Sequence, residues 1–206
     1  MSSAGLIRRA GDRSVLIELG GNQAVQRLAA ALEARRGGDL EEIVPGHETL
    51  LLVWNSPAPS VSEVEQLIAG AELAGEAMPQ PGEVELAVSY DGPDLAVVAE
   101  ACGFSAEEVV ARHLACRYQV AFIGFSPGFA YLLGGDVALQ PPRLAEPRTR
   151  VPSGALAIAG PYSAVYPRSS PGGWNLIGSC DEPVFDVAGD PPALLTAGTF
   201  VRLVAK

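Results

Sequence analysis

The second half of this chain is too rich in glycine and proline to form long helices. Between residues 121 and 178, 17 of 58 residues are Gly or Pro, and the apolar residues occur in short runs between them. Glycine weakens helices and proline breaks them, so this spacing favours short strands joined by tight turns. Residues 185–187 and 199–204, in which apolar and polar residues are mixed, are two further expected strands. The sequence therefore predicts a compact β-barrel with wide loops.

The first half alternates strand-like and helix-like patterns. Apolar, β-branched runs predict strands, and a helical period with Ser60-x-x-Glu63 capping predicts helices. The expected order is β-α-β-β-α, with residues 84–89 as a closing strand, which is typical of a ferredoxin-like split βαβ domain. The expected elements are strands at 14–19, 42–45 and 49–54 and helices at 22–36 and 60–73.

A short proline-containing segment, Met78–Gly82, is the expected linker between the two halves. We therefore predict an α+β protein with an N-terminal domain over residues 1–80 and a C-terminal domain over residues 83–206. Two short helices, at residues 94–102 and 105–116, are expected at the start of the second domain.

Charge and composition exclude several classes of protein. The formal net charge of −10 argues against nucleic acid or an anionic membrane as partner. Three cysteines without C-x-x-C spacing indicate neither a disulfide framework nor a metal site, and no long apolar run predicts a membrane span. Phosphate-loop, Rossmann and nucleophile-elbow motifs are also absent. We expect a cytoplasmic protein without a bound metal.

Four stretches carry most of the unusual sequence. They contain the blocks G-F-x-P-G-F-x-Y-L, P-R-x-x-V-P-x-G, I-A-G and Y-P-x-x-x-P-G-G-W, in that order, within residues 122–132, 146–154, 157–160 and 165–174. In these blocks the chain resembles the allophanate hydrolase subunit 1, or KipI, family, whose bacterial members include the B subunit of 5-oxoprolinase. The likeness extends over almost the whole chain, although Pro161–Ala164 replaces a Gly-Gln-Thr-Gly-like turn of the family.

The resemblance implies a fold, a reaction and partners. It implies a small α/β domain followed by a cyclophilin-like β-barrel. It implies ring opening of 5-oxo-L-proline to L-glutamate, with ATP, together with Mg²⁺, as co-substrate and no tightly bound cofactor. It also implies a C-type partner subunit of the allophanate hydrolase subunit 2, or KipA-like, kind and an A-type subunit of the LamB/YcsF kind. The chain would then be inactive alone.

Candidate anion-binding groups fall within these blocks. Consecutive glycines at Gly172 and Gly173, before Trp174, can direct backbone amides toward an oxyanion, although a tight turn before a core tryptophan explains them equally well. Arg148 and Arg168 belong to a group of four arginines, with Arg143 and Arg150, in an otherwise acidic chain. Guanidinium groups suit carboxylate and phosphate; ion pairing with Glu146, Asp136 or the partner is the alternative.

Candidate catalytic groups are fewer. His113 lies in the last turn of an expected helix, where the negative helix end favours imidazolium and would raise the pKa of the ring. We predict it to be a general acid or base, although a lone helical histidine is usually structural. Tyr166 is the second catalytic candidate, and Tyr131 and Ser153 are further hydroxyl donors for a lactam carbonyl. Tyrosine also packs well in barrel cores.

Two functional classes remain open at this point. The first is an enzyme subunit that forms, with its partner, a pocket for 5-oxoproline and ATP. The second is a KipI-type regulator that binds and inhibits a sensor histidine kinase. The glycine-rich and arginine-bearing loops favour the enzyme subunit over the regulator, because inhibition of a kinase does not require a pocket that binds an anion. A role in urea metabolism is weaker, because no biotin carboxylase or amidase segment is present.

Overall fold

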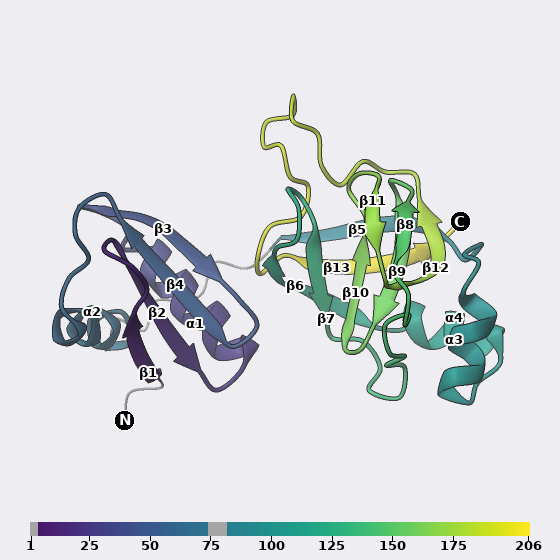
Figure 1. The fold of residues 1–206 in the computed structure, drawn as a ribbon, viewed down its shortest axis with the longest axis horizontal. Helices are drawn as coiled ribbons and strands as arrows, with labels where there is room; N and C mark the ends of the chain where they lie inside the picture. The colour runs from purple at the N-terminus through teal and green to yellow at the C-terminus, as the bar shows by residue number, and fades with distance from the viewer. Residues whose placement is uncertain (1–3, 74–81) are drawn as a thin grey trace. The chain divides into compact units, whose positions relative to one another are not determined.

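A computed structural model describes residues 4–73 and 82–206 of the chain. The chain divides into two compact units, Met1–Pro81 and Gly82–Lys206 (Figure 1). Most of the expected linker, residues 78–81, lies outside the described residues.

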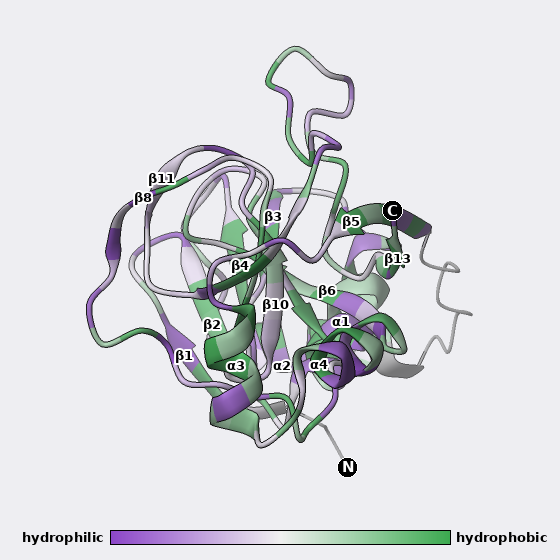
Figure 2. Ribbon diagram, turned by 90° about the vertical axis from the view of Figure 1, so that its right-hand side faces the viewer, coloured by the Kyte–Doolittle hydropathy of each residue, from purple (hydrophilic) through white to green (hydrophobic). Residues whose placement is uncertain are grey.

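The first unit contains a four-stranded antiparallel sheet with two helices, and three of these strands and both helices lie where the sequence predicts them. The sheet order is β1-β2-β4-β3, and β2 and β3 both run antiparallel to β4, which lies between them. This is the split βαβ arrangement. Alternate residues of β2 and β4 pack with α1 and α2 into one core, and Figure 2 shows both hydrophilic and hydrophobic residues along the helices. The elements are β1 (Ala4–Arg9), β2 (Ser14–Leu19), α1 (Asn22–Glu33), β3 (Leu40–Pro45), β4 (Thr49–Trp54) and α2 (Val61–Leu73).

The predicted closing strand of this sheet was wrong. Residues 84–89 form part of β5 (Glu83–Ser89), which pairs with β12 (Asn175–Cys180) and β13 (Phe200–Ala205) in the second unit. The fourth place in the sheet belongs instead to β1, which pairs antiparallel with β2. The sequence of β1 gives only a weak strand pattern, because two arginines follow Leu6 and Ile7. In the structure Leu6 is 47% exposed, so it adds little to the buried face of the sheet.

The second unit is a closed barrel of strand order β10-β7-β6-β13-β5-β12-β9. This confirms the predicted barrel. Residues 185–187, however, form no strand but only an isolated bridge between Phe185 and Ala193. The remaining barrel strands are β6 (Arg117–Ile123), β7 (Ala130–Leu133), β9 (Ala155–Ala159), β10 (Tyr162–Val165), β12 (Asn175–Cys180) and β13 (Phe200–Ala205).

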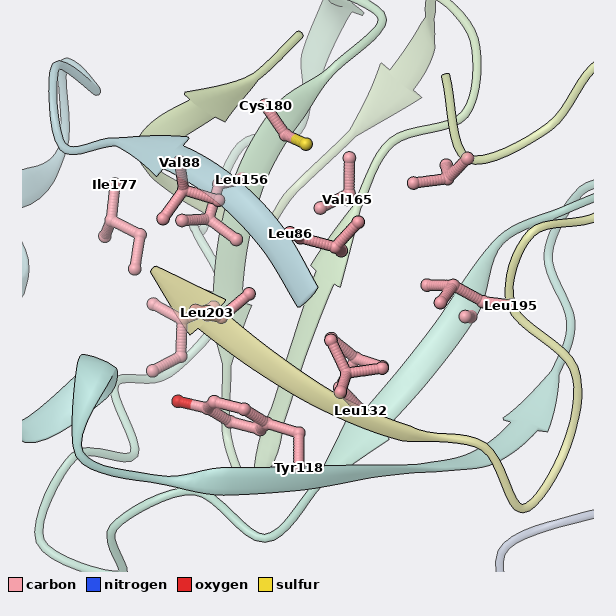
Figure 3. Packing of buried hydrophobic residues seen from close by; sticks show 14 of the residues in the cluster. Leu86, Val88, Tyr118, Leu132, Leu156, Val165, Ile177, Cys180, Leu195 and Leu203 are labelled. Carbon is pink, nitrogen blue, oxygen red and sulfur yellow. The ribbon is translucent and has the colours of Figure 1, made fainter. Parts of the chain in front are cut away.

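Both expected helices of the second unit are present, between β5 and β6. They are α3 (Leu95–Cys102) and α4 (Ala106–Leu114). Ser105 caps α4, since its Oγ accepts a hydrogen bond from Glu108 N at 3.1 Å. Apolar side chains from many strands fill the barrel, as Figure 3 shows for Leu86, Leu132 and Leu156.

Strand β9 builds two layers at once. Leu156 and Ile158 belong to the barrel core, whereas the alternate residues Ala155, Ala157 and Ala159 belong to a second buried cluster. That cluster also contains Val151 of β8 (Arg148–Val151), which pairs with β11 (Ser170–Gly172) in a two-stranded ribbon. Small alanines on this face let the ribbon and several aromatic rings pack closely on the outside of the barrel.

Candidate active-site pocket

A cavity of about 470 Å³ lies beside this second cluster. Its volume is typical of small-molecule sites. The residues around it come from β7, from the ends of β9 and β10 and the turn between them, from the ribbon and from four loops. They are Phe125, Phe129, Tyr131, Pro142, Arg143, Ala159, Gly160, Pro161, Tyr162, Tyr166, Gly172 and Trp174.

Aromatic rings form the walls of the cavity. Tyr131 alternates with the barrel-core residue Leu132 on β7, so its ring faces outward. Its ring centroid lies 5.4 Å from that of Tyr162 and 5.5 Å from that of Trp174, and Phe129 lies 5.5 Å from Trp174. Edge-to-face contacts of this kind fix the rings relative to one another. The result is a preformed apolar wall for a flat ligand.

Arg143 supplies the charge of the cavity and is the single cation among the residues that line it. No salt bridge found among residues 4–73 and 82–206 engages its guanidinium group. Burial raises the pKa of Tyr131 and Tyr166, and the nearby positive charge of Arg143 opposes this in both cases. Arg143 therefore lies near both phenols, which remain protonated donors at neutral pH. This arrangement suits a small carboxylic acid with a further acceptor.

Gly172 makes room for Tyr166. A Cβ atom at position 172 would lie 2.3 Å from the hydroxyl oxygen of Tyr166. A side chain here would displace the phenol, which also interacts with the Trp174 backbone. One physical reason for the first glycine is therefore close approach rather than an anion nest. The neighbouring Gly173 faces Pro147 at an ordinary distance of 3.6 Å.

Arg148 is not among the residues that line the pocket. It pairs with Gly172 across the ribbon, so these two predicted residues do come together. Its Nη2 donates to Asp94 Oδ1 at 2.6 Å, and the other oxygen of this carboxylate accepts a hydrogen bond from Leu176 N at 2.7 Å. The pair connects the ribbon to β12 and to the start of α3. Of the two alternatives, the structure therefore favours ion pairing for Arg148, with Asp94 as the partner.

His113 is buried in the barrel interior. The ring is 0% exposed; its Nδ1 lies 2.8 Å from the Tyr90 hydroxyl and its Nε2 lies 2.8 Å from the Ser163 hydroxyl. Burial lowers its pKa to about 3. The predicted rise was wrong, because desolvation outweighs the helix end. His113 does not line the cavity, and its acid–base role stays a prediction.

Two further predicted residues lie away from the cavity. Ser153 donates its hydroxyl to Pro167 O at 3.1 Å, so it stabilises the turn before the ribbon. Arg168 is exposed and does not contribute to the cavity wall. Of the predicted site residues, the structure thus brings together Tyr131, Tyr166, Gly172 and Trp174.

Sequence reasoning missed Arg143 as the key cation and Tyr162 as a wall residue. Arg143 was only one of four clustered arginines, and nothing in the sequence ranked it first. For Tyr162 a signal existed, because the turn Pro161–Ala164 departs from the family pattern. Both Pro161 and Tyr162 line the cavity.

Two absences were found in the described part of the chain. Within residues 4–73 and 82–206, no group of three or more His, Cys, Asp or Glu side chains is placed to hold a metal ion. Within the same residues, no helix combines the length and apolar content needed to cross a membrane.

Comparison with known proteins identifies the family. The family described as carboxyltransferase domain, subdomain C and D, matches residues 6–195. The chain is 38% identical to the B subunit of 5-oxoprolinase from Escherichia coli O157:H7, over 95% of this chain and 94% of that protein. It is 34% identical to the B subunit of 5-oxoprolinase from Bacillus subtilis strain 168, over 96% and 91%.

Solved structures agree with this. The protein TTHA0988 superposes with a TM-score of 0.80 at 36% identity, over 94% of this chain but only 39% of TTHA0988. The Kluyveromyces lactis urea amidolyase shares the fold, with a TM-score of 0.72 at 18% identity, over 97% of this chain and 15% of that one. The resemblance seen in the sequence is confirmed, and the chain belongs to the carboxyltransferase-domain family, subdomains C and D, together with the proteins named as B subunits of 5-oxoprolinase.

Proposed function

We propose that this chain is the B subunit of an ATP-dependent 5-oxoprolinase. With a C-type partner it would bind and activate 5-oxo-L-proline, and an A-type subunit of the LamB/YcsF kind would complete hydrolysis to L-glutamate. The observation that carries the proposal is the single guanidinium group of Arg143 near two protonated phenols in an aromatic pocket.

The chemistry of 5-oxo-L-proline fits this pocket. Its carboxylate can accept charge-assisted hydrogen bonds from Arg143. Its flat lactam ring can lie against the rings of Tyr131 and Trp174. The lactam carbonyl oxygen can accept a hydrogen bond from a phenol, which polarises the carbonyl and stabilises negative charge that develops on the oxygen. The raised pKa of Tyr131 and Tyr166 supports this role, because only the protonated phenol can donate.

The same residues fit a triphosphate poorly. A nucleotide triphosphate with Mg²⁺ needs several cations or a backbone cradle, and often a carboxylate for the metal. Arg143 is the single cation among the lining residues of this cavity, and the described residues offer no metal-holding cluster. We therefore keep ATP with Mg²⁺ as co-substrate but propose that the partner subunit supplies most of its contacts. Activity would then require the assembled subunits.

Reconstitution tests the proposal directly. The purified chain is mixed with the C-type and A-type subunits, ATP, Mg²⁺ and 5-oxo-L-proline, and glutamate is measured. We expect glutamate from the complete mixture and none when this chain is omitted. An inert complete mixture, with this chain alone blocking autophosphorylation of a sensor histidine kinase, would replace the enzyme with the regulatory function.

A further inference from the structure

The turn before β7 holds Phe125 in a backbone conformation that side chains rarely adopt. The φ angle of Phe125 is 62°, and Ser126 N donates a hydrogen bond to Gly124 O at 2.6 Å. A hydrogen bond across a single residue with positive φ defines the strained form of the γ-turn. Strain of this kind persists only where the surrounding structure enforces it, and it is concentrated at functional sites.

Neighbouring contacts enforce this turn. Phe129 N donates to Ser126 O at 3.0 Å, and Gly124 N donates to Phe129 O at 3.1 Å, which closes the loop. Gly128, with a φ of 76°, packs so closely on Phe185 that an added Cβ would lie 2.4 Å from the Cβ of Phe185. The turn is therefore fixed by its backbone and by the segment that carries Phe185.

The ring of Phe125 gains little from its own chain. It is 62% exposed, whereas Phe129 in the same loop is 2% exposed. Its contacts are edge contacts, with ring centroids 5.2 Å from Phe129 and 6.5 Å from Tyr166. It nevertheless lines the cavity that contains Arg143. A strained turn thus presents a large apolar ring to the ligand space rather than to the core.

We propose that Phe125 covers the bound ligand and sets the specificity of the pocket for small, flat cyclic acids. This inference rests on the proposed function and names the residue that would shield 5-oxo-L-proline from water. A planar amide can stack on the aromatic face. Excluding water also strengthens the interaction between Arg143 and the carboxylate, because screening in the covered site is weaker.

Two substitutions separate ligand covering from a structural role. Phe125→Ala removes the ring but keeps a side chain at positive φ, whereas Phe125→Gly removes both the ring and the strain. In the assembled enzyme, both variants should raise the KM for 5-oxo-L-proline about 5- to 10-fold. The kcat and the KM for ATP should change less than about twofold. Phe125→Tyr keeps an aromatic face, so its KM for 5-oxo-L-proline should stay close to that of the wild type.

Thermal unfolding of the same variants gives the second measurement. Phe125→Gly should unfold about 2–4 °C above Phe125→Ala, because glycine adopts the γ-turn without strain. The expected result is thus two variants that bind 5-oxo-L-proline equally poorly but differ in stability, with Phe125→Gly the more stable. If the Phe125 ring packed the fold, both variants would instead unfold well below the wild-type protein.

Each other outcome identifies what is wrong. An active wild-type assembly with unchanged KM in both variants would refute the covering role and leave the proposed function intact. An inactive wild-type assembly would remove both together. Unchanged KM combined with weaker assembly with the C-type subunit would make Phe125 a partner contact, and the inference would fail.

Discussion

Strand β10 separates two groups of polar side chains, an inner one around His113 and an outer one around Arg143, which differ in burial, charge and hydrogen bonding. Tyr162 lines the outer cavity with Arg143, whereas its neighbour Ser163 points into the barrel and lies 2.8 Å from His113 Nε2. The inner group is buried, neutral and fully hydrogen-bonded. The outer one contains a cation, Arg143, and tyrosines that line a cavity. Adjacent positions in the sequence therefore face the barrel core on one side and, on the other, the cavity where we propose that the substrate binds.

Under the proposed function, an arginine marks the pocket better than the histidine does. His113 has the more conspicuous side chain, but its two nitrogens are engaged by Tyr90 and Ser163. Arg143 is an ordinary residue in a loop, but its charge is available to a ligand. Availability of polar groups, rather than residue type, distinguishes the two regions.

Removing His113 tests the inner region and should have the largest effect. His113→Ala leaves a cavity and two unpaired hydroxyls, so the free energy of unfolding should fall by about 3–5 kcal/mol. Urea titration measures this, with exposed His47→Ala as control. The KM for 5-oxo-L-proline of the folded protein should stay unchanged. Full stability with lost activity would instead place His113 in the reaction.

Removing Arg143 tests the outer region. Arg143→Ala should raise the KM for 5-oxo-L-proline about 10- to 100-fold, because a charge-assisted hydrogen bond contributes about 1.5–3 kcal/mol. The melting temperature should not change. Arg202→Ala, at an exposed arginine paired with Glu85, is the matched control. Equal effects of the two substitutions would contradict the assignment of the pocket.

Acid should lower the free energy of unfolding through the buried His113. The folded pKa of His113 is lowered from 6.5 to about 3, so the unfolded chain binds the extra proton between these values. Stability is complete above pH 6.5 and falls as the pH decreases, by about 1.4 kcal/mol per unit. Unfolding measured between pH 7 and pH 5 should show this slope, and His113→Gln should abolish it. A slope that survives the substitution would assign it to other groups.

Substitution of the two neighbouring glycines, Gly172 and Gly173, should have the smallest effect and tests whether Gly172 is needed to make room for Tyr166. Gly172→Ala should displace the Tyr166 hydroxyl and lower kcat/KM about tenfold. Gly173→Ala places its methyl group at ordinary contact distance from Pro147 and should change kcat/KM less than about twofold. Kinetics of the assembled enzyme compares them. If Gly173→Ala is the more harmful change, the backbone amides matter more than the room for Tyr166.

Much of the fold was accessible from the sequence. Glycine and proline spacing predicted the barrel, and capping residues such as Ser60 and Ser105 predicted where helices begin. Residues 84–89 were assigned to the wrong sheet, because a strand pattern does not identify the partner strand. Phe185 was expected in a strand, but a local strand pattern cannot show whether a neighbouring strand is present to pair with it.

The site was less accessible, for physical reasons. The pKa of His113 depends on desolvation, which is a property of the closed barrel and not of its helix. Arg148 and Arg143 look alike in sequence, and only tertiary pairing with Asp94 distinguishes them. The sequence singled out Gly172 as a possible anion-binding backbone position, whereas in the structure the absence of a side chain there makes room for the Tyr166 hydroxyl.

The position of β13 has a consequence for the order of synthesis. This strand runs parallel to β5 and antiparallel to β6, so residues 200–205 fill the gap between strands made much earlier. The barrel cannot close until these residues leave the ribosome. The sheet of the first unit uses only residues 4–54 and can form well before that. Nascent chains stalled before residue 200 should therefore expose an open barrel edge to chaperones and proteases.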